Sequence, residues 1–258
     1  MKASSPKWTR EQLKLAFYLY CQLPYGKMNT GNPDIIKLAN IIGRSPGSVA
    51  MKLVNFASLD PSHTSTGRPG LKNTSAADKQ IWDEFYNDWE KLTAECAELL
   101  AKYDIDEVID GTPILNFKIP DSFAGETKTA KINARIGQTF FRKVVLASYQ
   151  NKCCMSGIAI PDILIASHIV PWSVAKDKRL NPSNGLCLSA IHDRAFDKGL
   201  MAVRPEYTIV VSKIINNDNS KQAQLLQGAH GKKITLPEKF LPDRDLLAWH
   251  YHNVFIRE

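Results

Sequence analysis

The 258-residue sequence has no long apolar run and little cysteine. No stretch reaches the ~20 consecutive apolar residues of a transmembrane helix, so we expect no membrane contact. The first residues, MKASSPKWTREQ, lack the apolar core of a secretory signal. Five cysteines, with Cys153 and Cys154 adjacent, are too few and too poorly spaced for a fold held by disulfides. We therefore expect reduced thiols and a cytoplasmic protein.

One sign of charge dominates each part of the chain, although the total is only +7. Residues 1–73 hold 10 basic and 3 acidic side chains, whereas residues 74–130 hold 5 basic and 13 acidic ones. Residues 131–258 return to a basic balance, with 18 against 10. Two basic segments around an acidic one indicate two surfaces for a polyanion such as nucleic acid, or chance clustering on solvated faces.

The first part of the chain has the pattern of a small helical domain. Thr9 followed by Gln12 is typical of a helix N-terminus, and apolar residues then recur at helical spacing. Two short helices around Gly43 form a helix-turn-helix-like pattern, with Ser45 as N-cap of the second. In DNA-binding proteins of this type the second helix enters the major groove. The side chains expected to face DNA are then Arg44, Ser48, Lys52 and Asn55.

The same polar face has a simpler interpretation, a helical hairpin whose outer side chains only meet water. The following loop is long and polar, and its Arg68 either enters a DNA groove or belongs to a flexible connector.

Residues 76–103 show apolar side chains at steps of three and four, which predicts one long helix. We expect the seam from Trp82 to Leu99 in the core, with a homodimer interface as the alternative.

These patterns predict the domain boundaries. We expect a helical DNA-recognition domain over residues 1–105, a linker over 106–130 and a second domain over 131–258. The second domain begins with an amphipathic helix, followed by an apolar strand within residues 153–160 and another that ends at His168. A polar loop and a further helix come next. The expected fold class is α+β, with a mainly α-helical N-terminal domain.

Three polar residues close together in the second domain carry the predicted chemistry: His168, Asn184 and His192. A β-hairpin followed by a helix can bring them to one point. A neutral His168 can take a proton from water, and a divalent cation held by His192 can neutralise charge on a phosphate. Asn184 can brace the intervening loop by bonding its backbone. Basic side chains that can hold non-scissile phosphates are Arg142, Arg194 and Lys198.

Four stretches of residues 131–258 resemble the HNH endonucleases of the ββα-metal superfamily, in a branch found in bacterial restriction enzymes. They are RIGQTFFRKVVLASYQNKCC, IASHIVPW, RLNPSNGLCLSAIHDRAFDKGL and LLAWHYHNVF. The resemblance implies a ββα-metal domain that cleaves DNA with Mg²⁺, Mn²⁺ or another divalent cation. It also implies that His168 is the general base, Asn184 the residue that organises the loop, and His192 the metal ligand.

Two features depart from the family pattern. Ser167 stands just before the base, where many relatives carry Asp or His as a second metal ligand. The cation then has His192 as its protein ligand, with water and phosphate in the other positions. Asp193 and Asp197 lie on the same expected helix, but the sequence assigns them no role. The chain also lacks paired C-x-x-C motifs, so we expect no structural zinc.

The sequence therefore predicts a metal-dependent DNA endonuclease. Its N-terminal domain is expected to select double-stranded DNA, and its HNH domain to cut it. A restriction enzyme is the favoured interpretation. The chain has no methyltransferase segment, and the analogy with fusions of a reader domain and an HNH domain suggests base modification of the target as one source of selectivity. Two alternatives stay open: a DNA-binding regulatory protein with an inactive HNH domain, and a nonspecific nuclease toxin restrained by a partner.

Overall fold

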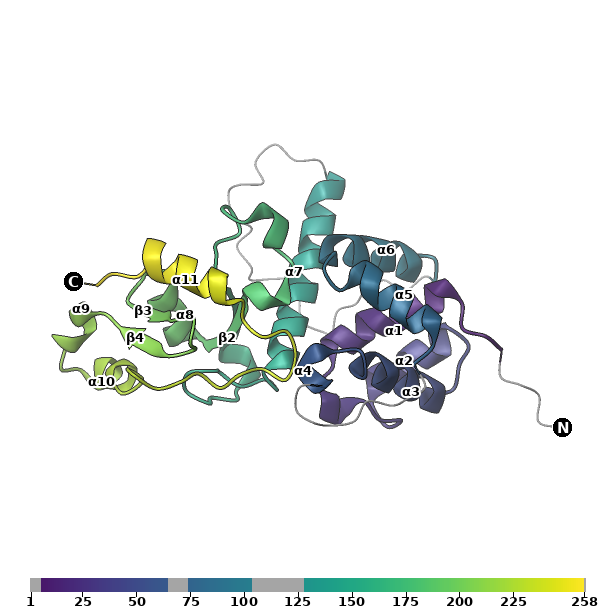
Figure 1. The fold of residues 1–258 in the computed structure, drawn as a ribbon, viewed down its shortest axis with the longest axis horizontal. Coiled ribbons are helices and arrows are strands. Elements are labelled where there is room, and N and C mark those ends of the chain that lie inside the picture. Colours follow the sequence, from purple (N-terminus) through teal and green to yellow (C-terminus); the bar gives the residue numbers. More distant parts are fainter. Residues whose placement is uncertain (1–5, 65–73, 104–127, 258) are drawn as a thin grey trace. The chain divides into compact units, whose positions relative to one another are not determined.

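The structure, a computed structural model, describes residues 6–64, 74–103 and 128–257 (Figure 1). Arg68 and nearly all of the predicted linker over 106–130 lie outside these described residues. Among the helices that are described, none combines the length and the apolar character that crossing a membrane requires.

The chain divides into two compact units, Met1–Phe140 and Phe141–Glu258. The described part of the first unit is helical, whereas the second adds two small antiparallel sheets to its helices. A helix-rich protein with small antiparallel sheets agrees with the predicted α+β class. Helix α7, Lys128–Ser148, runs across the division between the units.

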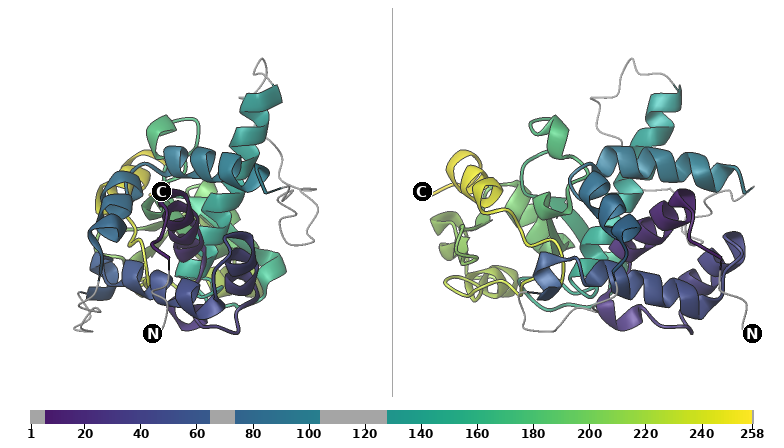
Figure 2. Two further views of the ribbon diagram at one scale, coloured as in Figure 1. Left: turned by 90° about the vertical axis from the view of Figure 1, so that its right-hand side faces the viewer. Right: turned by 45° about the vertical axis from the view of Figure 1, so that its right-hand side comes forward.

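Helix α1 is the central element of the first unit. It packs against α2, α3, α5 and α6, as the two views in Figure 2 also show. Thr9 and Gln12 form the predicted capping box at its start. Phe17 and Tyr20 of α1 contact the rings of Phe56 and Trp82, so aromatic side chains fill the core. The described helices of this unit are α1 Arg10–Gln22, η1 Tyr25–Lys27, α2 Pro33–Ile41, α3 Pro46–Ala57, α4 Pro61–Thr64, α5 Ala76–Phe85 and α6 Trp89–Ala101.

The single long helix predicted over residues 76–103 is wrong, because α5 and α6 are separate helices. The side chain of Asp88 accepts a hydrogen bond from the backbone N–H of Lys91 and so caps a new helix. Such short polar side chains compete for backbone groups and favour caps over helix interiors. The apolar side chains of the seam from Trp82 to Leu99 are buried within this unit. The homodimer alternative needed this seam to be exposed.

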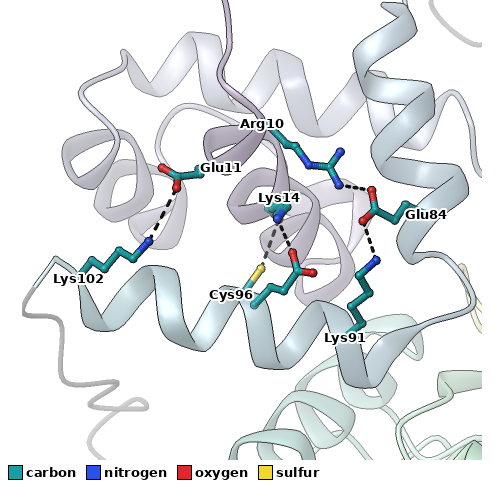
Figure 3. Close-up of polar contacts among 8 residues, drawn as sticks. Arg10, Glu11, Lys14, Glu84, Lys91, Cys96 and Lys102 are labelled. Atoms are coloured by element: carbon teal, nitrogen blue, oxygen red, sulfur yellow. Dashed lines mark hydrogen bonds and ion pairs between the residues drawn. The ribbon is translucent and has the colours of Figure 1, made fainter.

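Ion pairs connect α1 with α5 and α6 in the first unit (Figure 3). Arg10 pairs with Glu84, which also accepts a hydrogen bond from Lys91 Nζ at 2.8 Å. Lys14 pairs with Glu95. Hydrogen bonds from Lys91 and Arg10 lower the pKa of Glu84. Exposed and half-buried pairs of this kind contribute ~0–1 kcal/mol each, so the aromatic core contributes most of the stability.

The outward position predicted for Lys52 on α3 is wrong. Its side chain is buried, and Nζ lies 2.7 Å from Oδ1 of the fully buried Asp78. A buried ammonium needs such a partner, because taking an unpaired charge out of water costs several kcal/mol. Asn55 Nδ2 lies 3.4 Å from the other oxygen of Asp78. Both side chains therefore connect α3 to α5.

The side chain of Arg44, just before α3, also makes contacts within the first unit. Its guanidinium donates to the backbone carbonyls of Pro6 at 2.7 Å and Lys7 at 2.6 Å, and to Gln12 Oε1 at 2.9 Å. It also lies over the ring of Trp8, at 4.7 Å from the centroid. Of the four side chains predicted to face DNA from α3 and its cap, only the half-buried Ser48 lacks such a contact within the described residues. DNA binding by this helix stays a prediction.

The second unit is built around two antiparallel strands that a helix follows directly. In β1 and β2, Leu164 lies opposite Ser189 and His168 opposite Gly185. Helix α8 packs against both strands, and α11 packs against β3. After α7, the described elements are η3 Pro161–Ile163, β1 Leu164–His168, η4 Lys176–Lys178, η5 Pro182–Asn184, β2 Gly185–Ser189, α8 Ala190–Asp197, β3 Met201–Val203, β4 Ile209–Val211, α9 Lys213–Asn216, α10 Lys221–Gln227 and α11 Arg244–Asn253.

The strand predicted within residues 153–160 is absent. Cys153 and Gly157 instead close a turn, in which Gly157 N–H donates to the Cys153 carbonyl at 2.8 Å. The Cys153 N–H donates to the Ile158 carbonyl, also at 2.8 Å. The partner of β1 is the apolar run that begins at Gly185. Short apolar runs do not distinguish strands from other buried segments by periodicity alone.

His250 of α11 should make the second unit less stable in mild acid. Its ring is buried, stacks on Phe196 at 3.7 Å and bonds the Phe196 carbonyl through Nε2 at 3.2 Å. Burial lowers the pKa of His250 to about 4 from its ordinary value of 6.5, although the bond to the carbonyl opposes the shift. Between these values the unfolded chain binds more protons than the folded one, so stability falls as the pH falls.

We expect this histidine to remove about 2 kcal/mol of stability between pH 7.5 and pH 5. Urea unfolding of the full chain at both pH values, with EDTA present, measures the loss. His250→Phe keeps the ring stack and should abolish that part of the pH dependence. An equal loss in the variant and the wild type would contradict the assignment to His250.

Candidate active site

His168, the last residue of β1, has a ring held by neighbours from three segments. The ring of Phe141 on α7 lies parallel to it, at 4.0 Å between centroids and 6° between planes. Trp172 contacts it edge-on at 5.6 Å, and Nε2 lies 2.9 Å from the backbone carbonyl of Arg179. Arg179 also fixes Trp172, since its guanidinium lies over that ring and Nε donates to the Trp172 carbonyl at 3.2 Å. The orientation of the imidazole is therefore fixed before any substrate binds.

The contacts of His168 also determine which ring nitrogen carries the hydrogen and whether the ring is neutral. A carbonyl oxygen only accepts, so Nε2 carries the hydrogen and Nδ1 keeps its lone pair in the neutral ring. Nδ1 has no hydrogen bond to any residue that the structure describes. Burial lowers the pKa of His168, and the bond to the Arg179 carbonyl opposes this shift only in part. The side chain is thus a neutral proton acceptor at neutral pH.

Asn184, the last residue of η5, is fully buried and bonds the backbone of the loop that follows His168. Its Oδ1 accepts from the Val170 N–H at 2.8 Å, and Nδ2 donates to the Val170 carbonyl at 3.1 Å. Nδ2 also lies 3.3 Å from the Lys178 carbonyl. These are hydrogen bonds of the kind expected from the sequence, and they fix both ends of the loop that carries Arg179.

Gly185, opposite His168 in the strand pair, allows α7 to lie close to β2. A Cβ atom at this position would overlap the Val145 side chain and come within 3.0 Å of Phe141 Cζ. Only glycine therefore leaves room for the Phe141 ring to remain in place against the imidazole of His168.

His192 lies in the first turn of α8 and is buried. It is 1% exposed, and Ser189 Oγ lies 2.7 Å from its Nδ1. Although burial raises it, hydrogen bonding with His192 and Ser156 lowers the pKa of the Cys153 thiol to about 6. Since Ser189 lies opposite Leu164, His192 contacts the end of the strand pair away from His168. A metal-binding histidine usually has its other ring nitrogen hydrogen-bonded, so the metal-ligand role of His192 stays a prediction.

Oxygen atoms gather where β1 meets α8. The Ser167 hydroxyl is buried and makes no hydrogen bond of ordinary geometry within the described residues. It nevertheless lies beside the Asp193 carboxyl, whose pKa it lowers against the larger rise that burial causes. Burial and the negative charge of Asp193 raise the pKa of Asp197 to about 6.

These oxygen atoms allow a test of whether the domain fits a divalent cation. No group of three or more His, Cys, Asp or Glu side chains in the described ranges is arranged around a metal position. Mg²⁺, however, usually keeps several waters and takes only one or two protein carboxylates. The Ser167 hydroxyl and the neighbouring Asp193 carboxyl are oxygen ligands of the kind that such a hard cation prefers.

The three basic residues predicted to hold phosphates differ in their surroundings. Arg142 is half-buried, and its NH1 donates to the Leu164 carbonyl at 2.8 Å, so the structure gives it a role in fixing β1. Burial also lowers its pKa. Arg194 and Lys198 are exposed on α8 and form no ion pair with the residues that the structure describes. They remain candidates for phosphate binding.

A family of HNH endonucleases matches residues 153–204. This segment contains β1, β2, α8 and β3, together with His168, Asn184 and His192. The match supports the predicted resemblance to the HNH superfamily for this part of the chain. Comparison with curated proteins gives no match.

Sequence reasoning missed the groups that hold the imidazole of His168. The Arg179 carbonyl is a backbone atom, and no side-chain pattern marks it. Phe141 lies on the amphipathic helix expected at the start of the second domain, but its contact with His168 spans 27 positions of the chain, and no local pattern marks it. The spacing of Asp193 and Asp197, one helical turn apart, was a usable signal for a shared face of α8.

Proposed function

We propose that this protein is a metal-dependent DNA endonuclease in which His168 is the general base. The observation that carries the proposal is the free Nδ1 of a neutral, fixed imidazole, within a segment that matches HNH endonucleases. A general base must be in its unprotonated form at the working pH and within reach of the proton that it removes. The surroundings of His168 meet the first condition, and its position at the end of a strand favours the second.

The proposed reaction is hydrolysis of a phosphodiester bond. Nδ1 takes a proton from a water molecule while the water oxygen forms a bond to phosphorus and the P–O3′ bond breaks. The Arg179 carbonyl stabilises the imidazolium that results, since it accepts the hydrogen of Nε2. Asn184 keeps that carbonyl in place by bonding the loop at Val170 and Lys178. A divalent cation, when bound, supplies positive charge that neutralises the phosphate and the leaving oxygen.

We further propose that the first unit selects the DNA and that the protein is a restriction enzyme for modified bases. A nuclease site that holds DNA through phosphates is largely indifferent to sequence, so a separate element must provide selectivity. The basic balance of residues 1–73 supports a polyanion as the partner of this unit.

A cleavage assay on matched DNA tests the selectivity. One sequence is prepared with ordinary bases and again with methylated or bulkier bases, and both are incubated with Mg²⁺ or Mn²⁺. We expect cleavage of the modified DNA at a rate at least about 10-fold higher, a difference that corresponds to ~1.4 kcal/mol in the transition state. Equal rates on both DNAs would refute the restriction role and favour an unselective nuclease. Binding without cleavage of either DNA would favour the regulatory alternative.

A further inference from the structure

Two arginines lie against one tyrosine ring in the second unit. The guanidinium of Arg204, the residue after β3, lies 5.4 Å from the ring centroid of Tyr251 on α11, and that of Arg257 lies 4.9 Å from the same centroid. Phe255 stacks on Tyr251 at 5.4 Å between centroids. An aromatic ring attracts cations to its negatively charged faces, and a guanidinium stays charged at any ordinary pH. Tyr251 therefore holds two permanent positive charges close together.

These two charges are poorly neutralised within the part of the chain that the structure describes. Arg257 forms no ion pair there, and the carboxylate paired with Arg204 is that of Glu206, at 3.9 Å from NH1. This distance is too long for a hydrogen bond, and both side chains of the pair are exposed. An exposed pair of this kind contributes ~0–1 kcal/mol. An anion that binds both guanidiniums would relieve their mutual repulsion.

The end of the chain brings these arginines next to α8. The Ile256 N–H donates to the Gly199 carbonyl at 2.9 Å. A Cβ atom at Gly199 would overlap the Val254 carbonyl, and the φ of Gly199 is +69°, so only glycine allows this close approach. Lys198 precedes Gly199 and Arg257 follows Ile256 in the chain. The backbone of Lys198, at the end of α8, therefore lies beside that of Arg257.

The exposed side chains around Tyr251 and the end of α8 have a positive balance. The exposed cations outnumber the exposed acidic side chains by four to two: Arg194, Lys198, Arg204 and Arg257 against Asp197 and Glu206. The whole segment 131–258 is also basic, with 18 basic against 10 acidic residues. A surface of this sign attracts polyanions.

We propose that Lys198, Arg204, Tyr251 and Arg257 form a patch that binds the phosphate backbone of DNA, in addition to the proposed catalytic centre. A guanidinium can donate two parallel hydrogen bonds to one phosphate, and its planar fork is well suited to this geometry. Contact with the Tyr251 ring orients both guanidiniums before DNA arrives, which reduces the conformational entropy lost on binding. Such contacts fix the position of a duplex without reading its sequence. The choice of DNA as the ligand rests on the proposed nuclease function.

Binding of duplex DNA in EDTA tests the patch without cleavage. Fluorescence anisotropy of a short labelled duplex with ordinary bases gives the Kd for the full chain over a series of KCl concentrations. We expect Arg204→Gln combined with Arg257→Gln to weaken binding at least about 10-fold at low salt. The slope of log Kd against log salt should fall by about 2, because each lost phosphate contact removes ~0.9.

Lys213→Gln combined with Lys221→Gln is the matched control. Both lysines are exposed residues of the same unit, and the pair removes the same charge. They lie on α9 and α10, which contact each other, and α10 lies across β3 and β4 from α11 in Figure 1. The control should keep the salt slope of the wild type. An equal loss in the control and in the arginine variant would overturn the patch, since it would show only a general effect of net charge.

Two further variants separate geometry from charge. Arg204→Lys combined with Arg257→Lys keeps both charges, so the salt slope should stay that of the wild type. The Kd should still rise about threefold, because lysine binds phosphate as a point charge. Tyr251→Leu removes the ring that holds the guanidiniums, a contact that contributes ~0.5–1 kcal/mol, and should also raise the Kd about threefold. Wild-type affinity in folded Tyr251→Leu, as checked by circular dichroism, would contradict the role of the ring.

The outcomes separate this inference from the nuclease proposal. Unchanged affinity and salt slope in the double arginine variant would overturn the patch, although cleavage that depends on His168 could still be intact. Duplex binding that depends on both arginines, in a protein that cuts no DNA, would support the patch and refute the nuclease. Tighter binding of double-stranded RNA or of polyglutamate than of DNA, lost in the same variant, would overturn DNA as the ligand.

Discussion

Replacing His168 by alanine should reduce the rate of DNA cleavage by about 10²–10⁴-fold. The change removes a neutral proton acceptor whose Nδ1 makes no hydrogen bond to the described residues, and leaves the Arg179 carbonyl in place. A positioned base contributes to the transition state and little to DNA binding, so kcat should fall while the Kd for DNA stays the same. Single-turnover cleavage and filter binding on the same DNA measure the two quantities.

Folding must be separated from chemistry in this experiment, because the ring of His168 also packs on Phe141. His168→Asn, which is similar in size, should lose cleavage to the same extent as His168→Ala. His252→Ala is the control, since His252 is an exposed histidine of α11. Cleavage by His168→Ala within about threefold of the wild-type rate, well below the factor expected for a base, would show that another group takes the proton.

Local signals in the sequence were sufficient to predict most of the helices. The predicted caps Thr9 and Ser45 each cap a helix in the structure, because their side chains accept hydrogen bonds that the first turn would otherwise leave unmade. The break between α5 and α6 was not predicted, because the apolar spacing continues across it. The polar side chain of Asp88 favours a new helix start over continuation of the apolar spacing, and in the structure α6 begins there.

Only some features of the candidate site could be predicted from the sequence. A strand ending at His168 was predicted, and the structure contains it. Asn184 was predicted to bond the backbone of the loop, and it bonds Val170, but its burial was not predicted. The surroundings of His192 and Lys52 were not predictable, because each depends on a partner that is far away or on another element, such as Cys153 and Asp78. Helical spacing alone does not tell which of two neighbours, His192 or Asp193, turns towards β1. Packing of α8 on the strands determines that.

Replacing Asn184 by alanine should have the second large effect, through the loop. The Val170 N–H and the carbonyls of Val170 and Lys178 would each lose a partner in a buried place. Buried groups left unpaired cost ~1–3 kcal/mol each, so we expect a loss of about 3 kcal/mol or more in the stability of the second unit. Urea unfolding measures this loss, and Asn253→Ala on the exposed end of α11 is a control that should change it little.

Asn184→Asp distinguishes a bracing role from a merely space-filling one. The substitution keeps the shape and one acceptor for the Val170 N–H, but it places a second oxygen against two carbonyls where Nδ2 now donates. We expect it to be at least as harmful as alanine, whereas a space-filling role predicts that it is harmless. Because the loop carries the Arg179 carbonyl that fixes His168, kcat should fall in both variants at temperatures where they remain folded. An unchanged kcat in a folded Asn184→Asp protein would show that the loop does not position the base.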